Sequence, residues 1–498
     1  MILRSRHLGA FAKSTQLTSG IEHALTKPGI RAALVLFVFV SLYTLYGFRF
    51  FYRDPLSIFF STEHGYDRFY SQTREAEALT FLDHAAAARS DTPQLGGKAG
   101  DDPSICATFI TVGRNMSVAG RREYVDAAVG SALAKLSRAE RAALHLKVFF
   151  ADVPDAAAAH DSFRTFRDRL AARDAGVLDD VYTYDDTLPE LVKDQRLDVL
   201  EMLASDRANK HALERKSLYD YGYALDRCVE TTNASYIAVF EDDIVLADGW
   251  VARTLAHLRG VEEMMRDPRR KDPTKGVPAP GQANDWIYLR LFNQDRSVGW
   301  AGGTGFRDNN AHVISAAVAV PLLALLVAGR RWCLPRAAAR HLDGWTLLVV
   351  CGIATPLCVW LFFASGKASL VPQLAGVREE WFGCCNQALV YNRAHAPKLS
   401  TFFMRRSRDK QGGRGDMLSK DFAWDHGLSR LSAYPMLAQH VGVVSATNTT
   451  AEEAQQIWNL AFENFRPAKL AKQHVRDVRE IFGEEAAREL LEQQRHGT

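Results

Sequence analysis

Three long apolar runs stand out along an otherwise mixed chain. They cover Ala32–Phe48, Asn309–Gly329 and Gly344–Gly366, and none of them contains Asp, Glu, Lys or Arg. The first run has 17 residues, at the short end of what crosses a bilayer core, and the others have 21 and 23. We therefore predict three transmembrane helices. Bulky Tyr and Phe residues end the first run, where a cleaved signal peptide needs small ones, and this favours a retained anchor.

The charges beside these runs predict the orientation of the chain. Residues 1–31 carry five Lys and Arg against one Glu, and the loop 330–343 carries four Arg against one Asp. Short segments rich in Lys and Arg stay on the cytoplasmic side. Residues 49–308 and 367–498 then share the far side, so they can form one domain that a helical hairpin interrupts.

Alternating strand and helix patterns fill the far-side pieces. Apolar strand patterns occur at 105–112, 144–150, 181–184, 236–240, 286–292 and 387–391. Helical patterns between them cover 121–136, 159–175 and 213–230. This alternation predicts an α/β fold with a mixed, mainly parallel sheet flanked by helices.

The same patterns suggest domain boundaries. Residues 49–104 read as a stem and linker, because their last part is of low complexity. Residues 105–308 and 367–450 are expected to be the two parts of the α/β domain. Residues 451–498 are expected to be a C-terminal helical segment, broken at Pro467 and Gly483.

Composition adds only broad limits. The chain has 498 residues, with 61 Lys and Arg against 58 Asp and Glu, and its net charge of +3 gives no field that would attract nucleic acid. Hydrophobic residues make up 47% and charged residues 24%, values typical of folded globular proteins. Extensive disorder is therefore excluded.

The sharpest chemical feature is the sequence YIAVFEDDIV at Tyr236–Val245. An apolar strand runs into Glu241, Asp242 and Asp243 and then turns apolar again. At the carboxyl end of a parallel strand, where α/β folds bind ligands, three adjacent acids repel one another unless a cation compensates them. Carboxylate and phosphate oxygens suit Mg²⁺ or Mn²⁺. The pattern favours a metal that holds a nucleotide diphosphate; the alternative is a solvated turn after the strand.

The surroundings of the triplet carry a resemblance to a known family. RKSLYDYGYALDRC at Arg215–Cys228 precedes it, DGW at Asp248–Trp250 follows it, and the apolar hairpin comes after the next strand. This layout is similar to GT-A glycosyltransferases of the N-acetylglucosaminyltransferase IV type. It more closely resembles the Golgi GPI-anchor N-acetylgalactosamine transferase family, whose GT-A domain is split by a transmembrane hairpin. The resemblance extends from about Ala32 to Ser445.

The resemblance implies roles for the residues before the hairpin. Glu241, Asp242 and Asp243 would match the metal-binding triplet, with Asp243 as the direct ligand and Asp242 at the metal or the ribose. The segment ITVGRN at Ile110–Asn115 is similar to the family's first strand and loop, which cradle the nucleotide. Donor contacts would come from Arg114, Arg121, Arg122 and Lys216, although any single cation of this kind is more often a surface charge.

Residues after the hairpin would complete the site. WFGCCNQA at Trp381–Ala388 resembles the loop that leads to the strand beneath the donor sugar. Asp416 opens the next predicted helix, where an acid in GT-A enzymes often deprotonates the acceptor hydroxyl; the alternative is a helix N-cap, and Asp421 and Asp425 are further candidates. His440, in the segment QHVG, would be a late metal ligand or a structural histidine.

Together these roles imply an inverting, metal-dependent hexosyltransferase. The donor would be UDP-GalNAc, the metal Mn²⁺, and the acceptor a mannose in the GPI glycan of GPI-anchored proteins. The enzyme would be a multi-pass Golgi membrane protein with a lumenal catalytic domain next to the lipid bilayer. The choice of sugar rests on the resemblance alone. A basic segment, with Arg405, Arg406, Arg408, Lys410 and Arg414, would meet phosphates of the anchor or lipid, or be a flexible charged loop.

Two weaker signals favour a secretory lumen. Glycosylation sequons begin at Asn115, Asn233 and Asn448, all in the far-side pieces. Four cysteines lie in those pieces and three lie in or near the hairpin, so disulfides are possible on the far side, although their connectivity stays open. No cysteine spacing resembles a zinc site.

Two other functions remain open. A GT-A transferase that acts on N-glycans would need only the N-terminal anchor. A non-catalytic membrane scaffold could keep a transferase fold. A transporter is disfavoured, because three spans are few and none carries Asp, Glu, Lys or Arg.

Overall fold

A computed structural model describes most of the chain, namely residues 27–87, 99–113, 122–152, 160–171, 177–184, 186, 210–279, 281–297, 300, 304–371, 373–380, 385–444 and 450–496. The chain divides into two compact units. Unit 1 comprises Met1–Gly65 and Gly299–Pro372, and unit 2 comprises Tyr66–Val298 and Gln373–Thr498. Each unit is therefore assembled from two separate stretches of sequence.

Three helices of unit 1 are long and apolar enough to cross a membrane, at Pro28–Phe50, Asn310–Cys333 and Gly344–Ala364. They match the three apolar runs, so the prediction of three such helices is confirmed. The apolar parts of these helices are largely uncovered by the rest of the protein: at most 17% of their residues are buried. A helix that is apolar all round and uncovered suits the interior of a bilayer.

Two of these helices contain proline beyond their first residue. Pro321 lies inside α12 (Thr304–Ala328). Pro356 lies in the first turn of α15 (Thr355–Ala364), directly after a π-helical segment at Leu348–Ala354. The Thr355 hydroxyl donates a hydrogen bond of 2.9 Å to the Val350 carbonyl. Local π geometry and such side-chain bonds are the means by which membrane helices tolerate proline.

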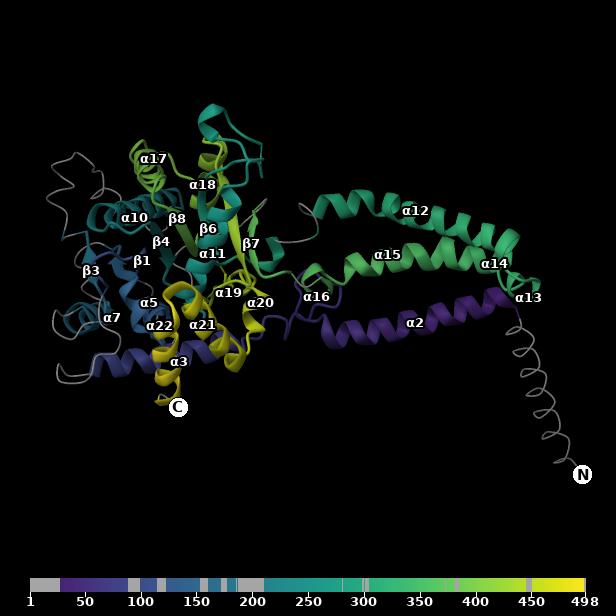
Figure 1. The fold of residues 1–498 in the computed structure, drawn as a ribbon, viewed down its shortest axis with the longest axis horizontal. Coiled ribbons are helices and arrows are strands. Elements are labelled where there is room, and N and C mark those ends of the chain that lie inside the picture. The colour runs from purple at the N-terminus through teal and green to yellow at the C-terminus, as the bar shows by residue number, and fades with distance from the viewer. Residues whose placement is uncertain are drawn as a thin grey trace, which may run out of the picture. The chain divides into compact units, whose positions relative to one another are not determined.

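An eight-stranded sheet forms the centre of unit 2 (Figure 1). Its strands are β1 (Ile105–Thr111), β2 (Leu144–Phe150), β3 (Asp180–Thr183), β4 (Tyr236–Glu241), β6 (Trp286–Arg290), β7 (Gly376–Glu379), β8 (Ala388–Asn392) and β9 (Ser429–Tyr434). Their order is β3-β2-β1-β4-β8-β6-β9-β7. The first four are parallel, β8 is antiparallel to both of its neighbours, β9 is parallel to β6, and β7 is antiparallel to β9. The predicted α/β fold with a mainly parallel sheet is confirmed.

The sheet combines strands from both stretches of unit 2. β1 to β4 and β6 precede the unit 1 segment Gly299–Pro372, and β7 to β9 follow it. β6 lies between two strands of the later stretch, because Leu289 pairs with Val390 of β8 and with Leu431 of β9. The two stretches therefore share one sheet.

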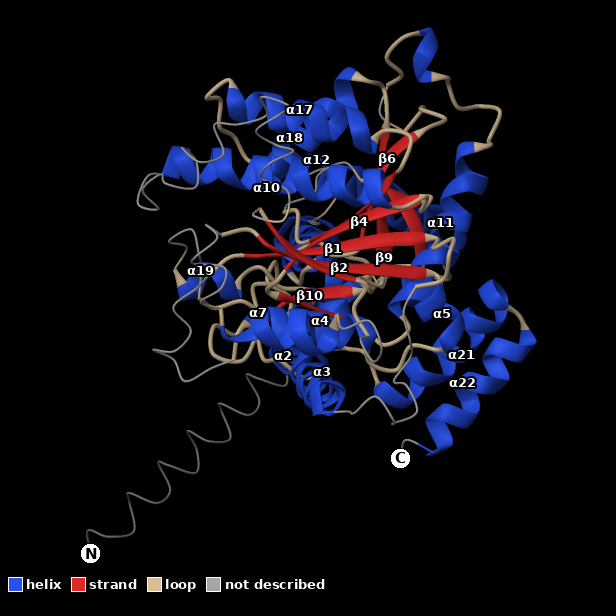
Figure 2. Ribbon diagram, turned by 90° about the vertical axis from the view of Figure 1, so that its left-hand side faces the viewer, coloured by secondary structure: helices blue, strands red, loops and turns tan. Residues whose placement is uncertain are grey.

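Helices cover both faces of this sheet (Figure 2). One face carries α3 (Tyr70–Ala87) and α4 (Tyr124–Leu133). The other face carries α10 (Lys210–Thr231), α17 (Ala396–Arg408) and α18 (Gly415–Asp425). Because both faces are covered, β1 is buried along nearly its whole length, which explains its almost continuous apolar sequence.

A disulfide ties β1 to α10. It joins Cys106 and Cys228, whose Cα atoms are 5.8 Å apart and which are 122 positions apart in the sequence. Cys385 also takes part in a disulfide, whereas Cys333, Cys351 and Cys358 are free. Disulfides in the sheet-bearing unit and free thiols in the apolar one agree with an oxidising compartment for unit 2.

Helix α3 differs from the expectation that residues 49–104 are only a stem and linker. It packs on α4 and belongs to unit 2. Arg74 is fully buried and donates hydrogen bonds to the carbonyls of Leu246 at 2.9 Å, Ser131 at 2.7 Å and Ala134 at 3.1 Å. Because Arg74 is charged and its neighbours on α3 are small or polar, the sequence pattern does not show which face of this helix packs on the core.

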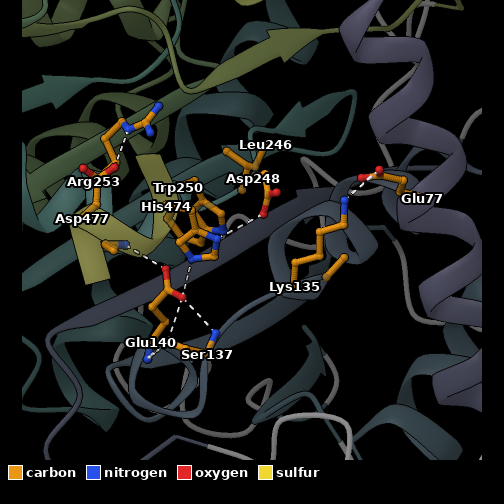
Figure 3. Close-up of polar contacts among 12 residues, drawn as sticks. Glu77, Lys135, Ser137, Glu140, Leu246, Asp248, Trp250, Arg253, His474 and Asp477 are labelled. Carbon is orange, nitrogen blue, oxygen red and sulfur yellow. Dashed lines mark hydrogen bonds and ion pairs between the residues drawn. The ribbon is translucent and has the colours of Figure 1, made fainter. Parts of the chain in front are cut away.

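The C-terminal helices are docked on the core of unit 2. Pro467 begins α21 (Pro467–Phe482), and Gly483 separates it from α22 (Glu484–His496), as the pattern predicts. α21 packs on α11 (Trp250–Met265). His474 of α21 is fully buried, between acidic residues of the core (Figure 3).

Candidate functional site

The acidic triplet lies at the carboxyl edge of the sheet, where β1 and β4 are neighbours. The chain builds β2 and β3 on one side of β1 and then places β4 on its other side, so the strand order reverses between β1 and β4. At such a switch point α/β sheets leave a crevice that binds ligands. The Thr111 hydroxyl donates a hydrogen bond of 2.7 Å to Asp242 Oδ2, and both side chains are buried. This bond joins the two strand ends.

Asp243 and His440 face each other beside this crevice. Asp243 precedes β5 (Ile244–Leu246), which pairs antiparallel with β10 (Ala438–His440), and the register places Ile244 opposite His440. His440 Nε2 consequently lies 3.5 Å from Asp243 Oδ2. The backbone N–H of Val441 donates a hydrogen bond of 2.8 Å to the Asp243 carbonyl, which fixes the pair from the backbone side.

Gly442 keeps space open between these two side chains. A Cβ atom at this position would lie 2.8 Å from Asp243 Oδ2 and 3.0 Å from His440 Nε2. Only glycine avoids this clash, so a carboxylate and an imidazole converge on a small volume that no other residue type would leave free.

Asp416 is linked to the same edge of the sheet through the segment before β8. The backbone N–H of Cys385 donates to Asp416 Oδ2 at 3.1 Å, and two positions later the Gln387 carbonyl accepts from the N–H of Glu241 at 2.9 Å. Two positions span at most about 7 Å of chain. The candidate base and the acidic triplet are therefore attached to one short backbone segment.

The surroundings of Asp416 do not match an N-cap. The N-cap of α18 is Arg414, which makes no side-chain cap, and Asp416 lies in the first turn. Its carboxylate is buried, with 6% of the side chain exposed, and Arg414 Nη2 donates to it at 2.9 Å. A negative charge there also suits the positive end of the helix dipole. Asp421 and Asp425 are exposed on the same helix.

A second polar group occupies the carboxyl end of β2, and we did not predict it. Asp152 Oδ2 accepts hydrogen bonds from the backbone N–H of Gly113 at 2.5 Å and from His160 Nε2 at 2.7 Å, and His160 Nδ1 lies 3.2 Å from Glu123 Oε1. Burial opposes a charge on His160, but the hydrogen bonds to Asp152 and Glu123 outweigh it and raise its pKa to about 9. The signal for Asp152 was its place directly after a buried strand.

The predicted donor-binding cations have carboxylate partners within the protein. Arg122 donates to Asp126 at 3.0 Å and to Asp83 at 2.7 Å. Lys216 donates to Asp220 at 2.7 Å and also to the Ala151 carbonyl at the end of β2. Lys216 thus lies near the carboxyl edge of the sheet. Arg114 and Arg121 lie outside the described residues.

The sequons are placed only in part. Asn233 is exposed between α10 and β4, where a glycan has room. Asn115 and Asn448 lie outside the described residues.

A hollow of about 750 Å³ borders the site on the α3–α4 side of the sheet. It reaches Val441, the residue that is bonded to Asp243, and its wall includes Arg122, Glu123 and Tyr124. Aromatic and planar polar side chains dominate the rest of its lining, including Tyr66, Asp67, Arg68, Phe69, Gln72 and Glu75. A volume of this size is typical of pockets that bind small molecules.

The four predicted metal ligands are not all brought together. Within the ranges that the structure describes, no three or more His, Cys, Asp or Glu side chains form a group that could hold a metal. Asp243 and His440 face each other, whereas Asp242 is engaged with Thr111. Mg²⁺ and Mn²⁺ sites often use only one or two protein ligands and complete their coordination with substrate phosphates and water, so the pair still fits such an ion.

Comparisons with known proteins do not assign this chain to a family. No protein-family model matches this chain, and no curated protein sequence matches it significantly. The resemblance drawn from the sequence therefore stays a prediction.

Proposed function

We propose that this chain is a membrane-bound glycosyltransferase of the GT-A type that takes a sugar from a nucleoside diphosphate. One observation carries the proposal: the acidic triplet lies at the β1/β4 switch point, and Asp243 converges with His440 on the space beside Gly442. A crevice with hard oxygen ligands suits a nucleotide whose phosphates need a divalent cation.

Asp243 and His440 would hold that cation, which supplies charge stabilisation for a departing diphosphate. Mn²⁺ is the ion that we favour, because it accepts both carboxylate and imidazole ligands. Asp242 would stay fixed by Thr111 and present its second oxygen to the ribose or the cation. Glu241, whose N–H is bonded to Gln387, would orient the strand end.

Asp416 is the candidate general base. A carboxylate that deprotonates an acceptor hydroxyl must be held in one orientation within reach of the reacting centre. The Cys385 N–H and Arg414 hold the Asp416 carboxylate, and the Cys385–Gln387 segment joins it to the triplet. A single displacement assisted by this base would invert the anomeric carbon.

The finer proposal follows the family resemblance. The donor would be UDP-GalNAc and the acceptor a mannose of the GPI glycan, in the Golgi membrane with unit 2 in the lumen. Three membrane-length helices and the Cys106–Cys228 disulfide support a membrane protein with unit 2 in an oxidising compartment.

A transfer assay on the detergent-solubilised full chain tests the proposal. UDP-GalNAc, UDP-GlcNAc and UDP-Gal are offered with a GPI-anchored protein or an N-glycoprotein, with Mn²⁺ or with EDTA. We expect Mn²⁺-dependent transfer to the GPI glycan. Asp243→Asn, which preserves shape and removes charge, should lower it at least about 100-fold, whereas Asp267→Asn on an exposed turn should not.

The same assay separates the alternatives. Transfer only to the N-glycoprotein would retain the site and reject the GPI acceptor. Full cellular function of the Asp243→Asn variant, with no turnover of any donor, would favour the scaffold. Turnover in EDTA that equals turnover in Mn²⁺ would contradict the metal role of Asp243 and His440.

A further inference from the structure

A buried histidine, His160, bridges two carboxylates at the carboxyl end of β2, and the chemistry proposed above does not use it. It precedes α7 (Asp161–Thr165), and only 3% of its side chain is exposed. Its Nε2 atom lies 2.7 Å from Asp152 Oδ2, and its Nδ1 atom lies 3.2 Å from Glu123 Oε1. The ring also packs edge-on against Phe150, with 5.1 Å between the ring centroids, so its plane is fixed.

The contacts of His160 require a positive charge on its ring. A carboxylate only accepts hydrogen bonds, whereas a neutral imidazole has one N–H and can donate only once. Both contacts are therefore hydrogen bonds only when both ring nitrogens carry a proton. Burial acts to raise the pKa of Asp152 and of Glu123, but their hydrogen bonds outweigh it and lower both values. Because the pKa of His160 is raised to about 9, all three groups are charged at neutral pH.

Charged side chains of α4 and α10 lie around this bridge. Asp126 of α4 accepts hydrogen bonds from the Ser162 hydroxyl at 2.6 Å and from Arg122 Nε at 3.0 Å. Lys216 of α10 attracts Asp152. The imidazolium is the group that bridges the two carboxylates, so the loss of its proton leaves both carboxylates facing a neutral ring.

The bridge reaches the crevice through the backbone of Gly113. Asp152 Oδ2 also accepts a hydrogen bond from the Gly113 N–H at 2.5 Å. A Cβ atom at Gly113 would lie 3.4 Å from His160 Nε2 and 3.5 Å from Asp152 Oδ2, so this backbone lies directly against the pair. Two positions earlier, Thr111 donates to Asp242 of the acidic triplet at 2.7 Å. The end of β1, which forms one wall of the crevice, is therefore tied to β2 on one side and to β4 on the other.

We propose that charged His160 is a positioning residue for donor binding, because it holds the β1 wall of the crevice in place through Asp152 and Gly113. This inference rests on the proposed function, since it takes the ligand of the crevice to be a nucleoside diphosphate. His160 acts through Asp152 and needs no contact with the ligand. When its charge is lost, two buried carboxylates lose the cation between them, so Asp152 and the backbone bonded to it shift.

Binding of UDP in the presence of Mn²⁺, measured by calorimetry on the full chain in a neutral detergent, tests the proposal. His160 is almost fully charged at pH 7, whereas about three quarters of it is neutral at pH 9.5, because its pKa is about 9. The Kd of His160→Gln should therefore exceed that of the wild type about tenfold at pH 7 and only about threefold at pH 9.5. The ratio of the two Kd values removes every titration that the two proteins share.

A second histidine–carboxylate pair supplies a matched control. His395 Nε2 lies 2.8 Å from Asp285 Oδ2, directly before the first residue of β6. β4 and β6 are both antiparallel to β8, so they run in the same direction, and β6 begins at the edge of the sheet opposite the crevice. His395→Gln removes the same type of contact there and should leave the Kd for UDP unchanged at both pH values.

A second variant tests the charge of His160 without replacing it. Glu123→Gln keeps the shape of the side chain but removes one of the two carboxylates that raise the pKa of His160. The affinity for UDP should therefore begin to fall at a lower pH than in the wild type. A histidine that only stabilised the fold would give no such displacement of the pH profile.

Three results would overturn the proposal: equal Kd values of wild type and His160→Gln at pH 7, a deficit of the same size at both pH values, or the same deficit in His395→Gln. If the wild type binds UDP with the expected pH dependence but transfers no sugar, the proposed transferase function fails and the positioning role stands. If sugar transfer is normal and His160→Gln binds UDP as the wild type does, the function stands and the positioning role fails. A wild type that does not bind UDP with Mn²⁺ would reject both.

Discussion

Helix α21 is docked by a buried histidine that carries a charge between two buried carboxylates (Figure 3). His474 Nε2 lies 2.7 Å from Glu140 Oε2, and its Nδ1 lies 3.4 Å from Asp248 Oδ1. Burial disfavours a charged imidazole, but the attraction of Glu140 and the contact with Asp248 outweigh it and raise the pKa of His474 to about 9. We predict that this docking weakens as the pH rises.

The size of the effect follows from the pKa. A rise from 6.5 in the unfolded chain to about 9 in the folded chain corresponds to about 3 kcal/mol of stabilisation. Because the folded pKa is the higher one, this stabilisation is fully present below pH 6.5 and disappears as the pH rises through 9. About 2 kcal/mol is lost between pH 6 and pH 8. The same ion pair lowers the pKa of Asp248 to about 2, although burial acts to raise it. Asp248 therefore changes the stability with pH only under acidic conditions.

Hydrogen exchange of the Pro467–Phe482 peptides measures this loss in the full chain. After correction for intrinsic exchange, the free energy of opening of α21 should fall by about 2 kcal/mol from pH 6 to pH 8. His474→Gln should lower it by about 3–5 kcal/mol at pH 6, because two buried carboxylates lose their cation, and should leave it independent of pH over this range. His211→Gln, at an exposed position, is the matched control.

Two results would refute the reasoning. The wild-type helix could open with the same free energy at pH 6 and pH 8, or the His474→Gln variant could keep the wild-type pH dependence. Either result would mean that His474 is neutral in the folded chain. Exchange in β1, which His474 does not contact, should not change with the substitution and shows whether an effect is local.

Three further predictions concern other parts of unit 2. Replacing Cys106 and Cys228 with Ala should lower the free energy of unfolding by about 2–4 kcal/mol, and a reductant should lower the thermal midpoint of the wild type by more than that of the variant, which keeps the disulfide of Cys385. Arg290→Met should cost about 3–5 kcal/mol in urea unfolding, because the buried Glu380 loses the partner that donates to it at 2.6 and 3.0 Å; adding Glu380→Leu should recover most of this loss. Gly442→Ala should weaken Mn²⁺ binding at least about tenfold in calorimetry, because the added Cβ would fill the space between Asp243 and His440; Gly260→Ala, where no atom lies within 4 Å of the added Cβ, should leave Mn²⁺ binding unchanged.

The sequence predicted the parts of the fold whose signals are local. The three apolar runs needed only length and the absence of charge, and the triplet Glu241–Asp243 needed only a strand that ends in acids. α10 and the breaks at Pro467 and Gly483 were also visible, because helical periodicity and helix-breaking residues act over a few positions.

Contacts between distant segments were beyond the sequence. The bond between Thr111 and Asp242 depends on the parallel register of β1 and β4, which are separated by about 130 residues and carry no local sign of their pairing. The pairing of Cys106 with Cys228 stayed open for the same reason. α3 was taken for a stem because its buried face contains Arg74, which bonds to Glu77 on the same helix and also to backbone carbonyls of distant segments that no side-chain pattern reveals.

The way in which unit 2 tolerates a long insertion can be traced to one buried side chain. Arg290 ends β6, just before the insertion, and its guanidinium is held by Glu380 and by the Cys385 carbonyl, which both follow the insertion. The entropic cost of closing a loop grows only slowly with its length. A helical hairpin between these residues therefore costs little more than a short loop at the same place. The ion pair and the pairing of β6 with β8 and β9 supply contacts that repay this cost within unit 2. The same link runs from Cys385 to Asp416, so the residues that join the two stretches of sequence also place the candidate base.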